Sequence, residues 1–384
     1  MKLLVYSHAF APQVGGVETF AMYLARDLAA SEPGKFNVTV ITQTNGRGDG
    51  HDALESFSIV RNPRAGELWQ RVRETDMVLL AGPAILPLLF ALLQRKRVVV
   101  THHGYQSICP NGMLFHLPTQ STCPGHFASG RYLECVKCNT AEEGAIRSAR
   151  LLVLTFVRRV LSRLADLNVA VSEHVRQRIA LPQTQVIRNG VPDFLALPEA
   201  PRVFTDQPHS FAFVGRLVTE KGVPVLVEAA SVLKKRGRDF RILIIGDGPQ
   251  RTALQARVAS LNLDQQVVFL GFLMGAELEE AMAGVSALVM PSICEDAAPF
   301  SVLEQMMQGR LIIGSDLGGL AEEIGDSGLT FAAGDAHALA AQMERVIEHP
   351  ELIARLGRMA RERAVESYTL HRMLDEYRAL TDAE

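Results

Sequence analysis

Three motifs that mark common nucleotide-using proteins are missing from this chain of 384 residues. No G-x-x-x-x-G-K-[ST] occurs, which argues against a P-loop ATPase, and no G-x-G-x-x-G follows an early strand, which argues against a dinucleotide-binding protein. The segment GDGPQR, residues 246–251, lacks the third glycine of that motif. No D-x-D occurs either, so the chain lacks the usual carboxylate pair for a catalytic divalent metal.

Long hydrophobic runs are also scarce. Met77–Gln94 has 18 residues without a charge, close to the length that spans a bilayer, but Gly82, Pro83 and Pro87 interrupt it. We therefore expect a buried strand Met77–Ala81, a Gly-Pro turn and a core helix that ends at Leu93. The apolar run in the start MKLLVYSHAF is too short for a signal peptide and is typical of a first strand. These patterns predict a cytoplasmic protein.

Length and composition indicate a folded protein of two domains, because single cores stop growing at roughly 250 to 300 residues. Hydrophobic residues make up 48% and charged residues 21%. The net charge of −3 is unevenly placed: residues 1–200 hold 21 Lys and Arg against 16 Asp and Glu, and residues 201–384 hold 18 against 26. The first half is therefore the half that suits an anionic partner, although an ordinary solvated surface explains this excess equally well.

Strand-like apolar runs alternate with helical patterns along the chain, which is typical of parallel α/β sheets covered on both faces. Residues 195–209 are proline-rich and lack periodicity, so they are the predicted interdomain linker. From about Asp335 the pattern is entirely helical. The predicted strands are Lys2–Tyr6, Asn37–Gln43, Met77–Ala81, Arg97–Thr101, Leu167–Val171, Gln185–Arg188, Phe211–Val214, Arg241–Ile245, Val267–Leu270, Ala287–Met290, Leu311–Gly314 and Leu329–Phe331.

The segment FVGRLVTEKG, Phe213–Gly222, follows a predicted strand and places Arg216 and Lys221 beside glycines. Open α/β sheets bind ligands at the carboxyl ends of their strands. Arginine offers a planar fork of donors and lysine a compact charge, so the two side chains suit a diphosphate. Two solvated cations on a loop are the alternative.

A second segment, PSICEDAAPFSVLEQMMQG, Pro291–Gly309, contains a helix that is predicted to begin at Pro299 or Phe300. Proline suits a first helical turn, and the free N–H groups of Phe300 and Ser301 suit a phosphate. Glu304, one turn into the helix, has the reach to accept hydrogen bonds from a pair of ribose hydroxyls. Its alternative role is a favourable interaction with the helix dipole.

The ordered set of segments resembles the retaining nucleotide-sugar glycosyltransferases of family 4. The resemblance rests on PQVGGVETF, VVVTHHG, VSEHV and IRNGV in the first half, and on GRLVTEKG, IIGDGPQR, FLGFL, the PS-to-E segment and SDLGGLAEEIG in the second. It implies the α/β GT-B fold, with two Rossmann-like domains facing across a cleft and a C-terminal helix crossing back to the first domain. It also implies an acceptor-side domain over 1–194 with a cysteine-rich insertion at 105–140, a nucleotide-sugar-binding domain over 210–365, and the returning helix over 366–384.

The resemblance also implies an activity. This is the metal-independent transfer of a sugar, with retention of configuration, from a nucleoside-diphosphate donor to a hydroxyl acceptor, in glycan, polysaccharide or glycolipid biosynthesis. A UDP-sugar is favoured and GDP-mannose stays open; no cofactor is needed for catalysis. Expected partners are the nucleotide sugar, an acceptor such as a lipid-linked glycan, and the inner membrane face through the basic first domain, but no nucleic acid. The alternatives are a weakly active nucleotide-sugar-binding or scaffolding subunit, and a GT-B isomerase or phosphorylase.

The same resemblance assigns site residues. The catalytic set is His103, with His102 as the fallback, together with Arg216, Lys221 and Asp296. The donor-binding set is Gly15, Gly16, Gly215, Gly246, Phe272, Glu295, Pro299, Phe300, Ser301 and Glu304. The family places a sugar-contacting Glu eight residues before Glu304, where this chain has Asp296. Either that shorter acid or, after a slip of one residue, Glu295 contacts the sugar.

Four of the five cysteines lie in the predicted insertion, at Cys109, Cys123, Cys135 and Cys138. The last two form a C-x-x-C pair, which suits half of a zinc site, whereas the spacing of the first two is irregular. Structural zinc is the favoured interpretation, and packing thiols and disulfides are the alternatives. A reducing cytoplasm argues against disulfides.

Overall fold

The computed structural model describes residues 1–30, 35–46, 52, 55–193 and 209–382, which form two compact units. The first unit comprises Met1–Pro118, Cys123–Asn189 and His371–Glu384, and the second comprises Thr119–Thr122 and Gly190–Leu370. The predicted linker, 195–209, lies outside the described residues except for His209, which begins a strand.

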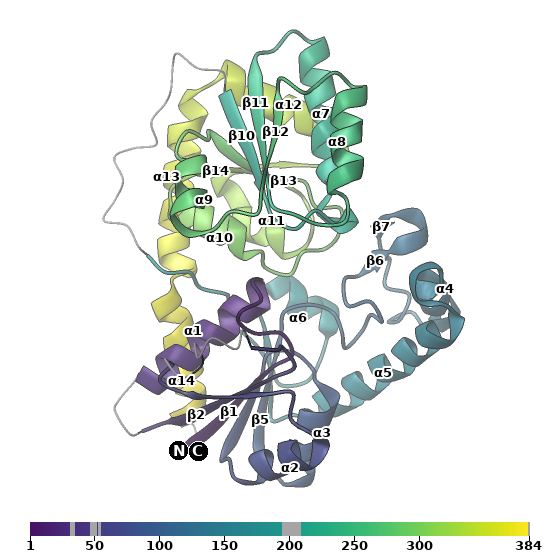
Figure 1. Cartoon of the computed structure of the whole chain (residues 1–384), viewed down its shortest axis with the longest axis vertical. Coiled ribbons are helices and arrows are strands. Elements are labelled where there is room, and N and C mark those ends of the chain that lie inside the picture. The colour runs from purple at the N-terminus through teal and green to yellow at the C-terminus, as the bar shows by residue number, and fades with distance from the viewer. Residues whose placement is uncertain (31–34, 47–51, 53–54, 194–208, 383–384) are drawn as a thin grey trace. The chain divides into compact units, whose positions relative to one another are not determined.

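A seven-stranded sheet forms the centre of the first unit, in the order β3-β2-β1-β4-β5-β8-β9 (Figure 1). Every neighbouring pair is parallel. The strands are β1 Lys2–Ser7, β2 Asn37–Thr42, β3 Ser58–Arg61, β4 Met77–Leu80, β5 Arg97–His102, β8 Leu167–Ala170 and β9 Thr184–Val186. Central strands such as β4, whose four residues are all buried, are apolar runs because helices cover both faces of a parallel sheet.

Helices of the first unit complete its core. One cluster of buried side chains joins β1, β4 and β5 to α2, α3 and α5. The helices are α1 Gly16–Ala30, α2 Ala65–Arg73, α3 Ile85–Leu93, α4 Tyr132–Glu143, α5 Ala145–Arg163, α6 Glu173–Ile179 and α14 Leu370–Asp382. The 3-10 turn η2 Leu117–Thr119 and the short strands β6 Phe115–His116 and β7 Ser121–Thr122 lie in the segment that precedes α4.

The second unit is built around a parallel six-stranded sheet of order β12-β11-β10-β13-β14-β15. The strands are β10 His209–Val214, β11 Phe240–Ile245, β12 Val267–Gly271, β13 Ala287–Met290, β14 Leu311–Ser315 and β15 Leu329–Phe331. This order is that of a Rossmann sheet, in which the chain reverses direction of winding beside the first strand. The switch point lies at β10, where ligands of such sheets bind.

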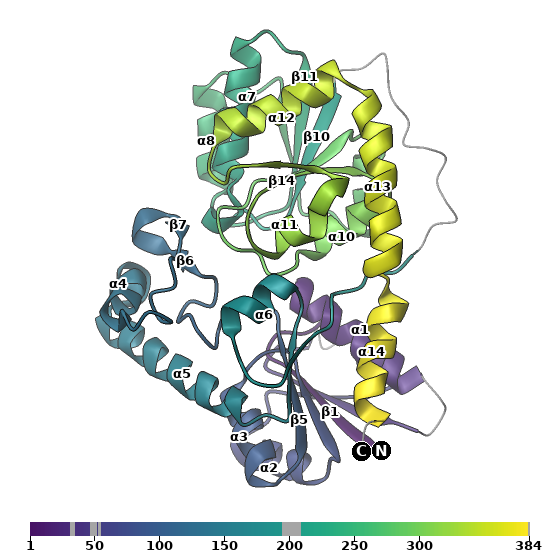
Figure 2. The same cartoon turned by 180° about the vertical axis from the view of Figure 1, so that it is seen from behind.

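Two groups of helices cover this second sheet (Figures 1 and 2). Helix α7 packs on α8 and α12, and helix α10 packs on α11 and α13. The helices are α7 Val223–Lys235, α8 Arg251–Ser260, α9 Gly275–Met282, α10 Phe300–Met307, α11 Gly318–Ile324, α12 Ala336–Glu348 and α13 Glu351–Ser367, with 3-10 turns η3 Thr219–Lys221 and η4 Gly325–Ser327.

All twelve predicted strands are present, most within one or two residues of the predicted bounds. The prediction Gln185–Arg188 was too long toward the carboxyl end, since β9 stops at Val186. Three strands were missed: β3, β6 and β7. Strand β3 has only four residues and lies at the sheet edge with no fully buried side chain, so it carries no strong apolar pattern.

The uncharged run Met77–Gln94 folds as predicted. It forms β4, a turn at Gly82, and α3, which begins at Ile85 and ends at Leu93. Within the part of the chain that the structure describes, no helix combines the length and apolarity needed to cross a membrane.

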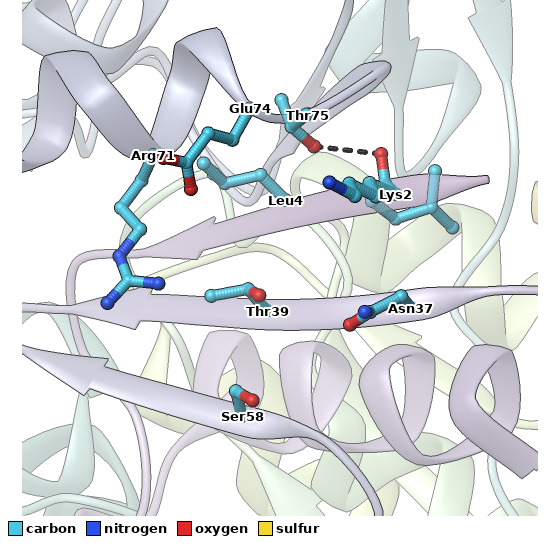
Figure 3. A pocket seen from close by; sticks show the side chains of 9 residues that line it. Lys2, Leu4, Asn37, Thr39, Ser58, Arg71, Glu74 and Thr75 are labelled. Atoms are coloured by element: carbon cyan, nitrogen blue, oxygen red, sulfur yellow. Dashed lines mark hydrogen bonds between the residues drawn. The ribbon is translucent and has the colours of Figure 1, made fainter.

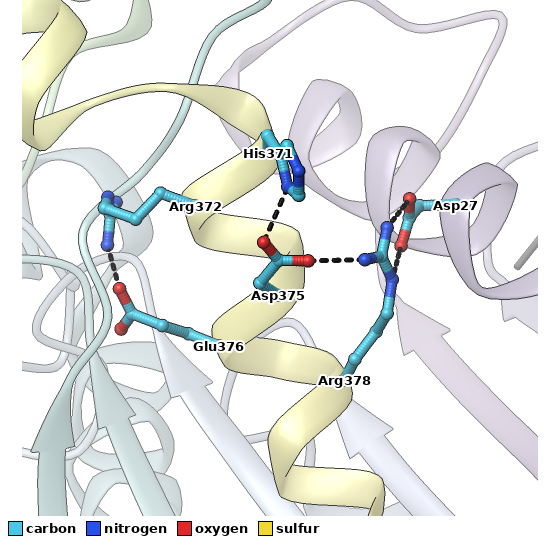
Figure 4. A network of polar contacts seen from close by, with 6 residues as sticks. All are labelled: Asp27, His371, Arg372, Asp375, Glu376 and Arg378. Carbon is cyan, nitrogen blue, oxygen red and sulfur yellow. Dashed lines mark hydrogen bonds and ion pairs between the residues drawn. The ribbon is translucent and has the colours of Figure 1, made fainter.

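The C-terminal helix α14 packs in the first unit, as the fold prediction required. Arg378 pairs with Asp27 of α1 and also with Asp375, and His371 Nδ1 lies 2.6 Å from Asp375 Oδ2 (Figure 4). Buried Tyr377 lies 2.9 Å from Thr101 Oγ1 at the end of β5. Helix α14 is therefore attached to α1 by the Arg378–Asp27 ion pair and to the sheet of the first unit by the Tyr377 hydroxyl.

Candidate functional site

In the second unit the predicted motifs meet at the carboxyl ends of the strands. Gly222 has φ +66°, and a Cβ there would lie 1.9 Å from Pro291 O. Gly246 has φ +136°, and a Cβ there would lie 1.9 Å from Gly215 O. Only glycine allows these approaches, so the loops after β10, β11 and β13 lie against one another.

Lys221 and Asp296 form the centre of this cluster. Lys221 Nζ donates to Asp296 Oδ1 at 2.6 Å, and Ser292 Oγ donates to Asp296 Oδ2 at 2.5 Å. Burial is the largest single effect on the pKa of Lys221 and lowers it, but the charge and hydrogen bond of Asp296, together with neighbouring groups, outweigh burial and leave that pKa raised. The Lys221 ammonium is therefore charged near neutral pH, and the Lys221 and Asp296 side chains hold each other in place.

The backbone around Asp296 is equally constrained. Gly319 N donates to the carbonyl of Asp296 at 2.6 Å, and Ile293 N donates to Glu220 O at 2.9 Å. At Gly318, where φ is +65°, a Cβ would lie 2.6 Å from Asp296 O. The segment SDLGG, residues 315–319, therefore packs directly against the backbone of the loop that carries Asp296.

Arg216, by contrast, is exposed. Its guanidinium makes no hydrogen bond or ion pair with any residue that the structure describes. Of the two predicted diphosphate cations, one is already paired and the other is available to an anion.

Helix α10 begins at Phe300, with Pro299 as its N-cap and no side chain bonded to the cap. The first intrahelical bonds start from Val302 and Leu303, which both donate to Pro299 O. Among the described residues, the N–H groups of Phe300 and Ser301 therefore have no acceptor. Open N–H groups at a helix start favour an anion.

Glu304 lies in the second turn of α10 and is half-buried. Burial raises the pKa of its carboxyl to about 7. This carboxyl therefore changes charge near neutral pH. The binding of any ligand that donates hydrogen bonds to it should then depend on pH.

Sequence reasoning missed Glu323 of α11. Its side chain is only 2% exposed, and neither carboxylate oxygen has a hydrogen-bond partner among the described residues. Burial, then the charges of Asp296 and Glu322, raise the pKa of Glu323 well above its ordinary value. The available signal was its spacing of three from buried Leu320, which places both side chains on one helix face.

In the first unit, β5 ends at His102 rather than at the predicted Thr101. His102 Nε2 lies 2.9 Å from Asn168 Oδ1, and burial lowers its pKa to about 4. His103 stacks edge-on against Phe20, with ring centroids 4.4 Å apart, and burial together with His102 lowers its pKa to about 3. His103 Nε2 is buried and has no partner among the described residues, so this neutral imidazole has one nitrogen to offer a ligand.

The remaining predicted residues lie in loops or at helix starts. Gly16 begins α1, and Gly15 O accepts a hydrogen bond from Thr19 N. Phe272 follows β12 and is 56% exposed. Glu295 is half-buried in the loop beside Asp296.

Comparison with known proteins shows the family. The model of the family described as Glycosyltransferase Family 4 matches residues 14–193, and that described as Glycosyl transferases group 1 matches residues 208–349. The chain belongs to glycosyltransferase family 4.

Relatives of this family 4 chain include 2-deoxystreptamine glucosyltransferase of Streptomyces kanamyceticus, 35% identical over 41% of each chain. Glycogen synthase of Mycobacterium tuberculosis is 31% identical over 49% of this chain and 45% of the relative. The matched part is thus less than half the length of these relatives. Among solved structures, Anabaena Alr3699/HepE in complex with UDP has a TM-score of 0.75 and 16% identity, and covers 100% of both chains. Sucrose-phosphate synthase from Thermosynechococcus elongatus has a TM-score of 0.74 and 20% identity over 100% of both chains. The fold is GT-B, as predicted.

The four clustered cysteines of the family 4 chain are all buried. Burial, then the charges of the other three thiols, raise the pKa of Cys135 to about 12. Cys138 Sγ accepts a hydrogen bond from Leu117 N at 3.4 Å. Within the described residues, no group of three or more His, Cys, Asp and Glu side chains has the arrangement of a metal site. Structural zinc stays a prediction.

A polar hollow of about 200 Å³ lies in the first unit beside α2 and the starts of β1, β2 and β3 (Figure 3). Its lining includes Lys2, Arg71 and Glu74, and Thr75 Oγ1 donates to Lys2 O at 2.8 Å. The amino ends of parallel strands are not where such sheets bind ligands, so the candidate site remains the cluster around Asp296.

Proposed function

We propose that this family 4 chain is a metal-independent, retaining glycosyltransferase that moves a sugar from a nucleoside-diphosphate donor, a UDP-sugar in preference to GDP-mannose, to a hydroxyl acceptor. The observation that carries the proposal is the paired Lys221 and Asp296 beside an unpartnered Arg216, on loops at the carboxyl ends of one sheet. That arrangement supplies both charge for a diphosphate and an oriented acceptor for a sugar hydroxyl.

Departure of the diphosphate leaves negative charge that must be stabilised. Arg216 provides a planar fork of donors, and Lys221 a charge whose position Asp296 holds before the donor arrives. The N–H groups of Phe300 and Ser301 add two neutral donors. The sugar–phosphate bond breaks as the acceptor oxygen bonds to the anomeric carbon, and the leaving phosphate accepts the acceptor proton.

Asp296 is the assigned sugar-contacting acid. Lys221 and Ser292 each occupy one of its oxygens, and each oxygen retains a further lone pair for a sugar hydroxyl. The pairing also keeps the carboxylate rigid, which offsets its shorter reach relative to a glutamate. Glu295 remains the competing assignment.

Two further groups complete the proposal. Glu304 accepts hydrogen bonds from the ribose, for which it must be ionised. His103 lies on the acceptor side, where its neutral imidazole offers Nε2 to the reacting sugar. Because its pKa lies near 3, His103 acts as a hydrogen-bonding group at neutral pH rather than as a cation.

Names of related proteins support a UDP-sugar donor. The Anabaena HepE neighbour was solved in complex with UDP and with UDP-glucose, and several relatives are named glucosyl- or related sugar transferases. A role in polysaccharide or glycan synthesis fits the relative named amylovoran biosynthesis glycosyltransferase AmsK of Erwinia amylovora.

The test incubates purified protein with UDP-, GDP- and ADP-sugars and a panel of hydroxyl acceptors, with and without EDTA. We expect transfer from one UDP-sugar, unaffected by EDTA, and a product whose anomeric configuration, read by NMR, matches the donor. A strict Mg²⁺ or Mn²⁺ requirement contradicts the metal-independent mechanism. Tight donor binding without transfer or hydrolysis favours a binding subunit, and transfer with inversion contradicts retention.

A further inference from the structure

Helix α5 of the first unit is apolar on two sides. Leu161 on one side belongs to the buried core of the unit, and Val157 packs partly against that core. Other apolar side chains of the same helix face outward, which is unusual because the outer face of a helix in a soluble domain is normally polar. Four such side chains and that of the C-cap residue Leu164, between 38% and 88% exposed, form what we call the α5 stripe: Ile146, Val153, Phe156, Val160 and Leu164.

The α5 stripe is continuous. With about 100° between successive residues, its members fall within an arc of roughly 80° on the helix surface. Ile146, at the start of the helix, is the most exposed large apolar side chain of the set at 88%. At about 1.5 Å per residue the stripe runs roughly 27 Å along the helix. The figure views show α5 as one long, unbroken helix (Figures 1 and 2).

Positive charge borders the stripe. Residues Ala145–Arg163 contain five arginines and no aspartate or glutamate. Arg150 and Arg163 are exposed and lie on opposite borders of the stripe by helical spacing. Arg147 pairs with Glu143 of α4 at 3.2 Å, whereas Arg158 and Arg159 are half-buried. An apolar face between arginines suits a surface that is apolar within and anionic at its boundary.

Aromatic side chains extend the α5 stripe near its middle. Phe156 stacks on Phe127 and Tyr132, with ring centroids 4.8 Å and 4.9 Å apart. Tyr132, at the start of α4, is itself exposed, and Leu133 beside it is more exposed still. Tyrosine favours the boundary between lipid and water, because one end of its side chain is apolar and the other polar.

We propose that the α5 stripe and its bordering arginines dock this chain on an anionic lipid bilayer. The helix lies in the plane of the interface, its apolar face entering the acyl boundary and Arg150 and Arg163 contacting lipid phosphates. A second copy of the chain is disfavoured as the occupant: a symmetric contact through α5 would bring arginines together with no carboxylate on the helix to neutralise them. The proposal does not depend on the sugar donor.

The test measures flotation of the full chain with lipid vesicles, without nucleotide. We expect partition onto phosphatidylcholine vesicles in which about a third of the lipid is phosphatidylglycerol, weak binding to pure phosphatidylcholine, and loss of binding as NaCl rises from about 0.1 M to about 1 M. Failure of the wild type to bind the anionic vesicles at low salt overturns the proposal.

Two α5 variants and two matched controls locate the contact. Ile146→Ser with Val153→Ser removes stripe area, and Arg150→Gln with Arg163→Gln removes charge; each should lower the partition coefficient at least about tenfold. Met274→Ser with Val365→Ser, and Arg355→Gln with Arg358→Gln, remove comparable exposed groups of the second unit and should leave binding unchanged. Thermal melting checks that each variant is folded. If one α5 variant does not fold, the loss of vesicle binding in the other is sufficient to support the proposal.

Three outcomes contradict the proposal. The α5 variants bind as the wild type does, the control variants lose binding equally, or the wild type forms a dimer that the α5 variants dissociate while neither binds vesicles. Light scattering measures the dimer, and this last result would mean that α5 forms a contact between two copies of the chain.

Discussion

The loops around Asp296 and the outer face of α5 are both incomplete in the free protein, but in opposite ways. Around Asp296 the structure leaves charged and hydrogen-bonding groups open, such as Arg216 and the first N–H groups of α10. On α5 it leaves apolar area uncovered. Water solvates open polar groups at little cost, but it does not compensate exposed apolar area. The first region is therefore suited to a soluble ligand that comes and goes, and the second to a surface that excludes water.

Within the polar region, Lys221 is already paired with Asp296, whereas Arg216 is open to a ligand. Each of Lys221→Ala and Arg216→Ala should lower turnover by roughly two to three powers of ten, because each removes charge from the departing diphosphate. Only Lys221→Ala should also lower the melting temperature, since it removes the cation that pairs with Asp296. Steady-state kinetics and thermal melting measure the two effects.

Lys235→Ala, which removes an exposed lysine of α7, is the matched control and should change neither the turnover nor the melting temperature. The double mutant should lose less than the product of the singles, because both groups serve one phosphate. Wild-type turnover in either single mutant refutes the donor-site assignment.

Asp296 and its neighbour Glu295 give the next largest effect. Asp296→Ala should lower turnover at least about tenfold, the cost of one charge-assisted hydrogen bond, while Glu295→Ala should be nearly silent. Kinetics with a fixed donor and acceptor measure both variants. The reverse result transfers the sugar contact to Glu295, and full activity in both variants removes this segment from catalysis.

We expect the affinity for a UDP-sugar to depend on pH through Glu304. Its folded-state pKa near 7 means that it is mostly ionised at pH 8 and mostly protonated at pH 6. If the carboxylate accepts ribose hydrogen bonds, the affinity for a UDP-sugar should fall about tenfold from pH 8 to pH 6. His102 and His103, with pKa values near 4 and 3, stay neutral over this range. Calorimetry on wild type and Glu304→Gln checks this: the variant should lose the dependence, and an unchanged pH profile in the variant assigns it to another group.

The smallest effect concerns the unpartnered Glu323. Its pKa is raised in the folded state, so the stability of the neutral form is present below the ordinary pKa of a glutamate and is lost as pH rises through the folded-state pKa. Glu323→Gln should therefore raise the unfolding free energy at pH 8 by about 1 kcal/mol and change it little at pH 4. Urea unfolding at both pH values measures this, with exposed Asp326→Asn as the control. Destabilisation at pH 8 means that the carboxylate has a partner in solution.

Sequence patterns predicted those parts of the chain that local periodicity and strand polarity determine. Apolar runs such as Ala287–Met290 located the strands, and parallel pairing then required the loops after β10, β11 and β13 to meet at one edge. The pairing of Lys221 with Asp296 was not predictable, because it depends on Gly222 lying against Pro291 across the fold.

Two other features ran against the expected patterns. A glutamate is seldom buried without a partner, so the burial of Glu323 had no support in residue type. Helix α5 has apolar residues on both sides, and their periodicity alone does not separate a core face from an exposed one.

The most direct test of the central claim is a crystal structure of the protein with bound UDP. We predict that the diphosphate lies at the carboxyl edge of the second sheet, with oxygens within hydrogen-bonding distance of the Arg216 guanidinium and of the N–H groups of Phe300 and Ser301, and that the ribose hydroxyls contact Glu304. UDP bound elsewhere, or a diphosphate that contacts neither Arg216 nor the start of α10, would contradict it.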